Sequence, residues 1–122
     1  MTAFDPRYLK AIDHFNRGEY FEAHEVWEDY WVETMDERKC FLHGLVQAAV
    51  TLHHAKRGNY GGARSLYERM KNNLHLYRPS YMALDVDRFL ARMAACLAPA
   101  LADPPSPVDS KTIPTIALTE ST

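Results

Sequence analysis

Three polar side chains, His24, Glu28 and His53, have the types and the spacing that a metal site needs. A histidine four residues before a glutamate lies on the same face of a helix, so His24 and Glu28 can act together. His53 falls within the apolar face of the next long predicted helix, and helical proteins complete carboxylate–histidine metal sites with a ligand from a neighbouring helix. One hypothesis is therefore a divalent-metal site. The simpler alternative is a histidine–glutamate hydrogen bond without an ion.

Further polar residues near these three widen the predicted binding site. The full predicted set is Glu22, His24, Glu25, Glu28, Gln47 and His53. No strong catalytic signature accompanies it: His24-Glu25 begins like the zinc-protease motif, but a glutamate occupies position 28, where that motif has its second histidine. The glycines also lack the Lys-Ser/Thr pair of a phosphate-binding loop. The sequence therefore leaves open whether the chain is an enzyme.

These residues lie in the first of two similar segments. Residues 15–31 and 55–68 share a frame at an interval of forty residues. The matched pairs are Arg17-Gly18 with Arg57-Gly58, Tyr20 with Tyr60, Ala23 with Ala63, and Glu28 with Glu68. An interval of this length is typical of stacked helical hairpins, in which a glycine turns one helix into the next. Residues 22, 24 and 25 differ between the two segments, so hairpin packing does not require the residues found there.

Start and stop signals divide the chain into five helices. We predict helices over residues 6–17, 19–33, 35–57 and 60–77, and a fifth that begins after Asp85. Asp5-Pro6 starts the first helix, and a capping box over residues 34–37 starts the third, which has the widest apolar face and should be central. The fold class is therefore all-α, a compact five-helix domain of residues 1–102 built on two repeated hairpins.

The composition changes after residue 102. Residues 103–122 contain four prolines and many serines and threonines, so we expect a mostly disordered C-terminal tail. Within it, the apolar residues of 113–118 give a weak signal for docking onto the domain.

Composition and cysteine usage limit the setting. The chain has 122 residues, 47% of them hydrophobic, and no apolar run approaches the roughly twenty residues that a membrane helix needs. The N-terminus lacks an apolar signal core, so we expect a cytoplasmic protein without a membrane association. Cys40 and Cys96 are too far apart for a metal knuckle, and we expect both to be buried thiols.

The net charge of −2 hides an uneven distribution. Residues 18–37 contain eight acids and no lysine or arginine, whereas residues 38–78 contain eight lysines or arginines and one acid. We expect these segments to complement each other within the fold or across a homodimer. The near-neutral total and the lack of a compact basic run make nucleic-acid binding unlikely.

Three segments, YFEAHEVWEDYW, GLVQAAVTLHH and RGNYGGARSL, resemble the all-helical bacterial and archaeal family catalogued as domain of unknown function 309. The resemblance covers about residues 8–77. It implies a compact helical fold that can dimerise, and it implies no established activity. The repeat also resembles, in part, the hairpins of tetratricopeptide proteins, which bind peptides or partner proteins.

Taken together, these features favour a non-catalytic protein-interaction or self-association module that forms a homodimer and can bind a protein partner. The alternative is a metal-dependent hydrolase or ligand-binding protein with its site between the second and third helices. No cofactor is certain, and a divalent metal at His24, Glu28 and His53 is the only cofactor candidate.

Overall fold

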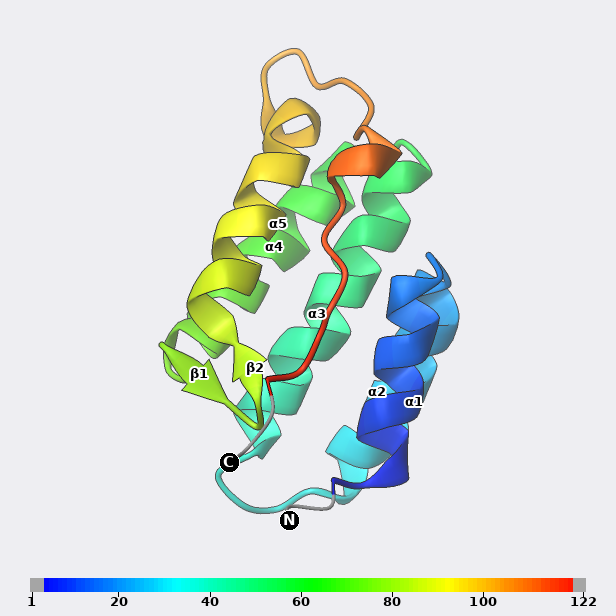
Figure 1. Ribbon diagram of the computed structural model, residues 1–122. Helices are drawn as coiled ribbons and strands as arrows, with labels where there is room; N and C mark the ends of the chain where they lie inside the picture. The colour runs from blue at the N-terminus through cyan, green and yellow to red at the C-terminus, as the bar shows by residue number, and fades with distance from the viewer. Residues whose placement is uncertain (1–3, 120–122) are drawn as a thin grey trace.

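The computed structural model describes residues 4–119 and confirms the all-α fold class with five helices (Figure 1). The helices are α1 (Pro6–Asn16), α2 (Tyr20–Glu33), α3 (Lys39–Lys56), α4 (Tyr60–His75) and α5 (Val86–Leu101). Two short antiparallel strands, β1 (Ser80–Tyr81) and β2 (Leu84–Asp85), form a hairpin between α4 and α5, and a 3-10 turn, η1 (Ser110–Thr112), follows α5.

The two predicted hairpins are α1 with α2 and α3 with α4. Gly18 and Gly58 both have a φ of +78°, a conformation that L side chains rarely adopt, and both donate their N–H to the carbonyl three residues earlier. A histidine of the preceding turn contacts the residue after each glycine. His14 Nδ1 lies 2.8 Å from Glu19 Oε1, and His54 Nδ1 lies 3.3 Å from the side-chain nitrogen of Asn59. The forty-residue repeat therefore extends to these histidines.

The central helix is α3, as predicted. It packs on α2 along one side and on α4 along the other, and eleven of its residues are buried. Gly44 allows α4 to come close, because a Cβ atom at this position would lie 2.6 Å from Leu74 Cδ2. The largest fully buried side chain is Trp27 of α2. One cluster of buried residues includes members of both hairpins, so the core is continuous from the first hairpin to the second.

Four of the five helices start within one residue of the predicted position, and α3 starts later than predicted. Asp5 and Asp85 cap α1 and α5, each accepting a backbone N–H from the first turn. The predicted capping box before α3 is wrong, because α3 begins at Lys39 and lacks a side-chain cap. The Thr34 hydroxyl donates instead to the Tyr30 carbonyl of α2, 2.7 Å away, and so belongs to the end of that helix.

The acidic and basic segments form few ion pairs with each other within one chain. In the part of the chain that the structure describes, the only ion pair between residues 18–37 and 38–78 joins Asp36 to Arg38. Glu33 pairs instead with Arg7 of α1, at 2.7 Å. The charge complementarity predicted from sequence therefore produces only this one ion pair between the two segments within the described chain. The cysteine prediction is half right, since Cys96 is buried and Cys40 is exposed.

The C-terminal residues differ from the expectation of a mostly disordered tail. Residues 113–119 run back between α5 and α1, and Figure 1 shows this stretch in red crossing in front of α3. Ile116 is only 4% exposed, and Pro114 is buried as well. The sequence signal for docking at residues 113–118 is thus correct, although the segment forms neither a helix nor a strand.

Two glycine substitutions test the close packing of α3 on α4. Gly44→Ala should lower the free energy of unfolding by about 1–3 kcal/mol, because the added methyl group overlaps the buried Leu74 side chain. Gly61→Ala, in the first turn of α4, meets nothing within 4 Å and should raise stability by up to about 1 kcal/mol through helix propensity. Urea unfolding followed by circular dichroism measures both changes. If Gly44→Ala were as stable as Gly61→Ala, the close approach would be wrong.

Candidate functional site

The predicted pair on α2 forms a direct contact. His24 Nε2 lies 2.9 Å from Glu28 Oε2, and the other ring nitrogen, Nδ1, lies 3.1 Å from the backbone carbonyl of Phe21. Both ring nitrogens therefore face oxygen atoms. The side chain of His24 is 21% exposed and that of Glu28 is 46% exposed, so the pair lies at the surface and water can reach it. A pair this exposed contributes little to stability.

His53 of α3 does not join this pair directly. The ring of Phe21 packs against both histidines, with its centroid 5.3 Å from that of His24 and 5.5 Å from that of His53. Burial lowers the pKa of His53 below its ordinary value, and the nearby positive charge of Arg57 lowers that pKa further. The neutral imidazole, which is the form that binds metal, is therefore favoured at His53.

Of the remaining predicted residues, Glu22 lines a pocket together with Phe21 and His53. Glu22 and Glu25 are exposed on α2. Gln47 is buried on α3 and accepts a hydrogen bond of 2.8 Å from Asn73 of α4, so its side chain connects the two helices of the second hairpin. Within residues 4–119, no group of three or more His, Cys, Asp or Glu side chains is arranged to hold a metal ion. The structure thus pairs His24 directly with Glu28 and places Glu22 and His53 in the lining of one neighbouring pocket.

Metal binding at His24, Glu28 and His53 remains a prediction that melting curves test. If the site binds metal, zinc or manganese should raise the melting temperature of the wild type above its value in chelator, and His24→Ala or His53→Ala should remove that gain. The control is His75→Ala, at an exposed position at the end of α4. Identical wild-type curves in chelator, zinc and manganese would leave the hydrogen-bonded pair as the whole function of His24 and Glu28.

A second site lies at the other side of the molecule, where residues 113–119, here called the tail segment, occupy a groove. Inward and outward residues alternate along it: Pro114 and Ile116 are buried, whereas Thr115, Ala117 and Thr119 are exposed. This alternation is typical of an extended peptide that lies on a surface with one face buried. The groove, here called the tail groove, is bounded by α1, α5 and the β1–β2 hairpin.

One side chain of α1 binds the backbone of the tail segment at its buried residue. Asn16 Nδ2 donates to the Ile116 carbonyl at 2.8 Å, and Asn16 Oδ1 accepts the Ile116 N–H at 2.7 Å. An amide offers one donor and one acceptor side by side, so it satisfies both backbone groups of a single extended residue. Asn16 ends α1, just before the Gly18 turn, and there its side chain reaches the segment.

The β1–β2 hairpin holds the end of the tail segment. Its turn residues Met82 and Ala83 have positive φ angles of 48° and 63°, which are uncommon for residues other than glycine and cost free energy. Both turn carbonyls are used: the Tyr8 hydroxyl donates to Met82 at 3.0 Å, and the Thr119 N–H donates to Ala83 at 2.8 Å. Burial raises the pKa of Tyr8, which keeps its hydroxyl protonated as a donor.

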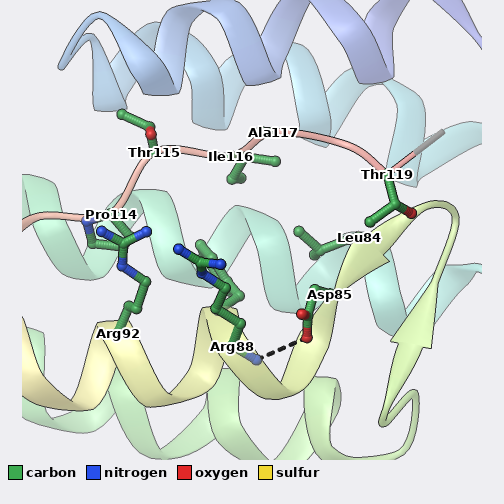
Figure 2. A pocket seen from close by; sticks show the side chains of 10 residues that line it. Leu84, Asp85, Arg88, Arg92, Pro114, Thr115, Ile116, Ala117 and Thr119 are labelled. Atoms are coloured by element: carbon green, nitrogen blue, oxygen red, sulfur yellow. Dashed lines mark hydrogen bonds between the residues drawn. The ribbon is translucent and has the colours of Figure 1, made fainter.

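Between the tail segment and α5 lies a pocket of about 350 Å³. Figure 2 shows Arg88 and Arg92, from successive turns of α5, reaching from the helix toward the tail segment on the opposite wall. Both arginines are exposed. Leu84 and Phe89, which are buried, also line the pocket, so apolar surface lies beside the two guanidinium groups.

Few residues of this second site can be recognised from the sequence. Asn16 is a single polar residue at a helix end, and no local pattern marks it as a ligand for a segment one hundred residues away. The arginines are ordinary polar positions of an amphipathic helix. The one usable signal was the alternation of apolar residues at 114, 116 and 118 with threonine and alanine, which predicts a half-buried extended segment.

Comparison with known proteins confirms the predicted family resemblance. The family model described as "Domain of unknown function (DUF309)" matches residues 8–66, a shorter stretch than the predicted 8–77. An uncharacterized protein of Bacillus subtilis (strain 168), YpuF, is 37% identical over 68 residues, which are 55% of this chain and 37% of that protein. An uncharacterized protein of Aquifex aeolicus (strain VF5) is 40% identical over 47 residues, which are 37% of this chain and 14% of that protein.

Two facts concern what these relatives imply about function. The chain spans well under half the length of either relative, and both carry names without an activity. The matched region contains α1, with Tyr8 and Asn16, but ends before α5 and the tail segment. Among the helices of residues 4–119, none is long and apolar enough to cross a bilayer.

Proposed function

We propose that this chain is a non-catalytic protein-interaction module whose binding site is the tail groove. The observation that supports this function is the way the groove holds its present occupant: Asn16 pairs with both backbone groups of Ile116 while the isoleucine side chain is buried. An extended peptide is thereby recognised through its backbone and through one apolar anchor. Domains that bind extended peptides commonly divide affinity and specificity in this way.

The partner is a protein segment with the same chemistry as the tail segment. Pro114 and Ile116 supply the buried side chains, and the exposed positions between them can vary because they face water. A partner segment must therefore be extended, with an aliphatic residue at the position of Ile116. No charge is required at the anchor, because the side chain there is surrounded by apolar groups.

A second copy of the chain carries such a segment, so the same groove supports self-association. Two chains that exchange their tail segments form a closed dimer in which each groove is filled by the other copy. The acidic residues 18–37 and the basic residues 38–78 make a single ion pair with each other within the described chain, so others of their charges can meet between copies. The homodimer is part of the proposal for these two reasons.

Peptide binding to the full-length chain tests the proposal. The probe is a fluorescent peptide of residues 111–119, and its anisotropy reports binding. In the wild type the tethered tail segment competes with the peptide, so the apparent affinity is weak. Ile116→Ser in the chain removes the buried anchor of the competitor and should strengthen peptide binding at least about tenfold, since burying an isoleucine side chain contributes roughly 1.5–3 kcal/mol. Light scattering of the wild type tests for the exchanged dimer.

Two controls separate the groove from general stickiness. Asn16→Ala, combined with Ile116→Ser in the chain, should remove most of the gain, because the backbone groups of the added peptide then lack partners. A peptide in which its own isoleucine is replaced by serine should not bind the Ile116→Ser chain. If this control peptide bound as well as the original, or if Asn16→Ala had no effect, the proposed site would be wrong.

A second candidate function, a metal-dependent hydrolase or ligand-binding protein, is favoured by one observation, the 2.9 Å contact between His24 and Glu28. These side chains provide two potential ligands on one helix face, and a third would have to come from His53 of α3. The melting comparison in chelator, zinc and manganese decides between this candidate and a purely structural pair.

A further inference from the structure

We propose that the pocket between α5 and the tail segment binds a small molecule that carries a phosphate group, with Arg88 and Arg92 as its ligands. This inference goes beyond the proposed protein interaction, since it concerns a different ligand in a different cavity. Figure 2 shows the arrangement: the two guanidinium groups extend from α5 into the gap below residues 114–119.

The charges of the pocket are the first argument. Arg88 and Arg92 are four residues apart on one helix face, where like charges repel each other. Within the described residues neither forms an ion pair. Four other arginines, Arg7, Arg17, Arg38 and Arg78, each pair with a carboxylate, and the arginines without an ion pair elsewhere in the described chain do not line this pocket. Two uncompensated guanidinium groups that converge on one cavity favour an anion there.

Asp85 is the one acidic residue of the pocket lining, and its carboxylate binds a backbone group and neither guanidinium. Its carboxylate accepts the backbone N–H of Arg88 at 3.0 Å and so caps the start of α5. Figure 2 shows this bond at the end of the pocket, whereas the guanidinium of Arg92 lies at the opposite end, beside Pro114. With two arginines against this one aspartate, the side chains of the lining have a net positive charge.

The number of arginines and the size of the pocket indicate the ligand class. A carboxylate has two oxygen atoms, which one guanidinium can bind through two parallel hydrogen bonds, whereas a phosphate group offers three oxygens and twice the charge to two such forks. The volume of about 350 Å³ lies at the small end of the range for small-molecule pockets. Leu84 and Phe89 can cover an apolar group attached to the phosphate.

The pocket exists only while the tail segment is in place, because residues 114–117 and 119 form one of its walls. A ligand bound there contacts both α5 and the segment, and so favours the state in which the tail groove is filled by its own chain. Binding at the two sites is then linked: in the Ile116→Ser chain, an added peptide of residues 111–119 supplies the same wall, so the small molecule and the peptide should each strengthen binding of the other by the same factor.

Titration of the full-length chain with matched probes tests the assignment. The probes are phenyl phosphate, benzoate and inorganic phosphate at fixed ionic strength, and the readout is the NMR signal of the arginine Nε–H groups together with the dissociation constant. Phenyl phosphate should shift the signals of Arg88 and Arg92 and bind more tightly than the other two probes. Arg88→Gln and Arg92→Gln should each weaken it about tenfold or more, since each removes charge-assisted hydrogen bonds.

The control is Arg69→Gln, which makes the same change of charge at an exposed position of α4 outside the pocket lining. It should leave the dissociation constant unchanged within about twofold, because a distant surface charge is screened by salt. Ile116→Ser, which loosens the wall without altering an arginine, should weaken phenyl phosphate as well. Equal losses in Arg69→Gln and Arg88→Gln would overturn the site, and benzoate binding as tightly as phenyl phosphate would overturn the phosphate assignment. Neither result depends on the peptide experiment, so the two proposals fail separately.

Discussion

An extended stretch of chain can be buried only if partners are found for its backbone N–H and C=O groups, and at Ile116 both partners come from one side chain. Asn16 supplies a donor at 2.8 Å and an acceptor at 2.7 Å, and these bonds connect residues one hundred positions apart. Without them, burial of the isoleucine would leave two backbone polar groups unsatisfied at a cost of about 1–3 kcal/mol each. Three features depend on this contact: the filling of the tail groove, the pocket wall that the tail segment forms, and the hydrogen bond from the Thr119 N–H to the Ala83 carbonyl.

The remainder of the groove is arranged around the same segment. The β1–β2 turn carries two residues other than glycine at positive φ, a costly geometry that the Tyr8 and Thr119 bonds help to hold. Tyr8 and Asn16 lie within residues 8–66, the part that matches the family model, whereas the arginines and the segment itself lie beyond it. The site is therefore formed partly by residues that match the family model and partly by residues that lie outside the match.

What the sequence could predict follows from the range of the interactions. The hairpins were predictable because a glycine at positive φ and helix periodicity are local signals, and each appears twice at Gly18 and Gly58. The start of α3 was not, because Thr34 can satisfy either its own helix end or the next one, and packing on Tyr30 decides between them. His24 and Glu28 were correctly paired since they are one turn apart, but the packing of Phe21 against both His24 and His53 depends on how α2 and α3 rotate against each other. Ile116 lay in a segment with a local signal for docking, but nothing local marked Asn16 as its partner.

Amide hydrogen exchange at Ile116 tests the central claim most directly, because its N–H has the Asn16 side chain as its partner. We predict that this amide exchanges far more slowly than that of an unstructured peptide, on a scale of minutes or longer, and that Asn16→Ala removes the protection while α3 amides stay protected. Exchange of the Ile116 amide at the unstructured rate in the wild type, with α3 fully protected, would show that the tail segment does not occupy the groove and would contradict the account.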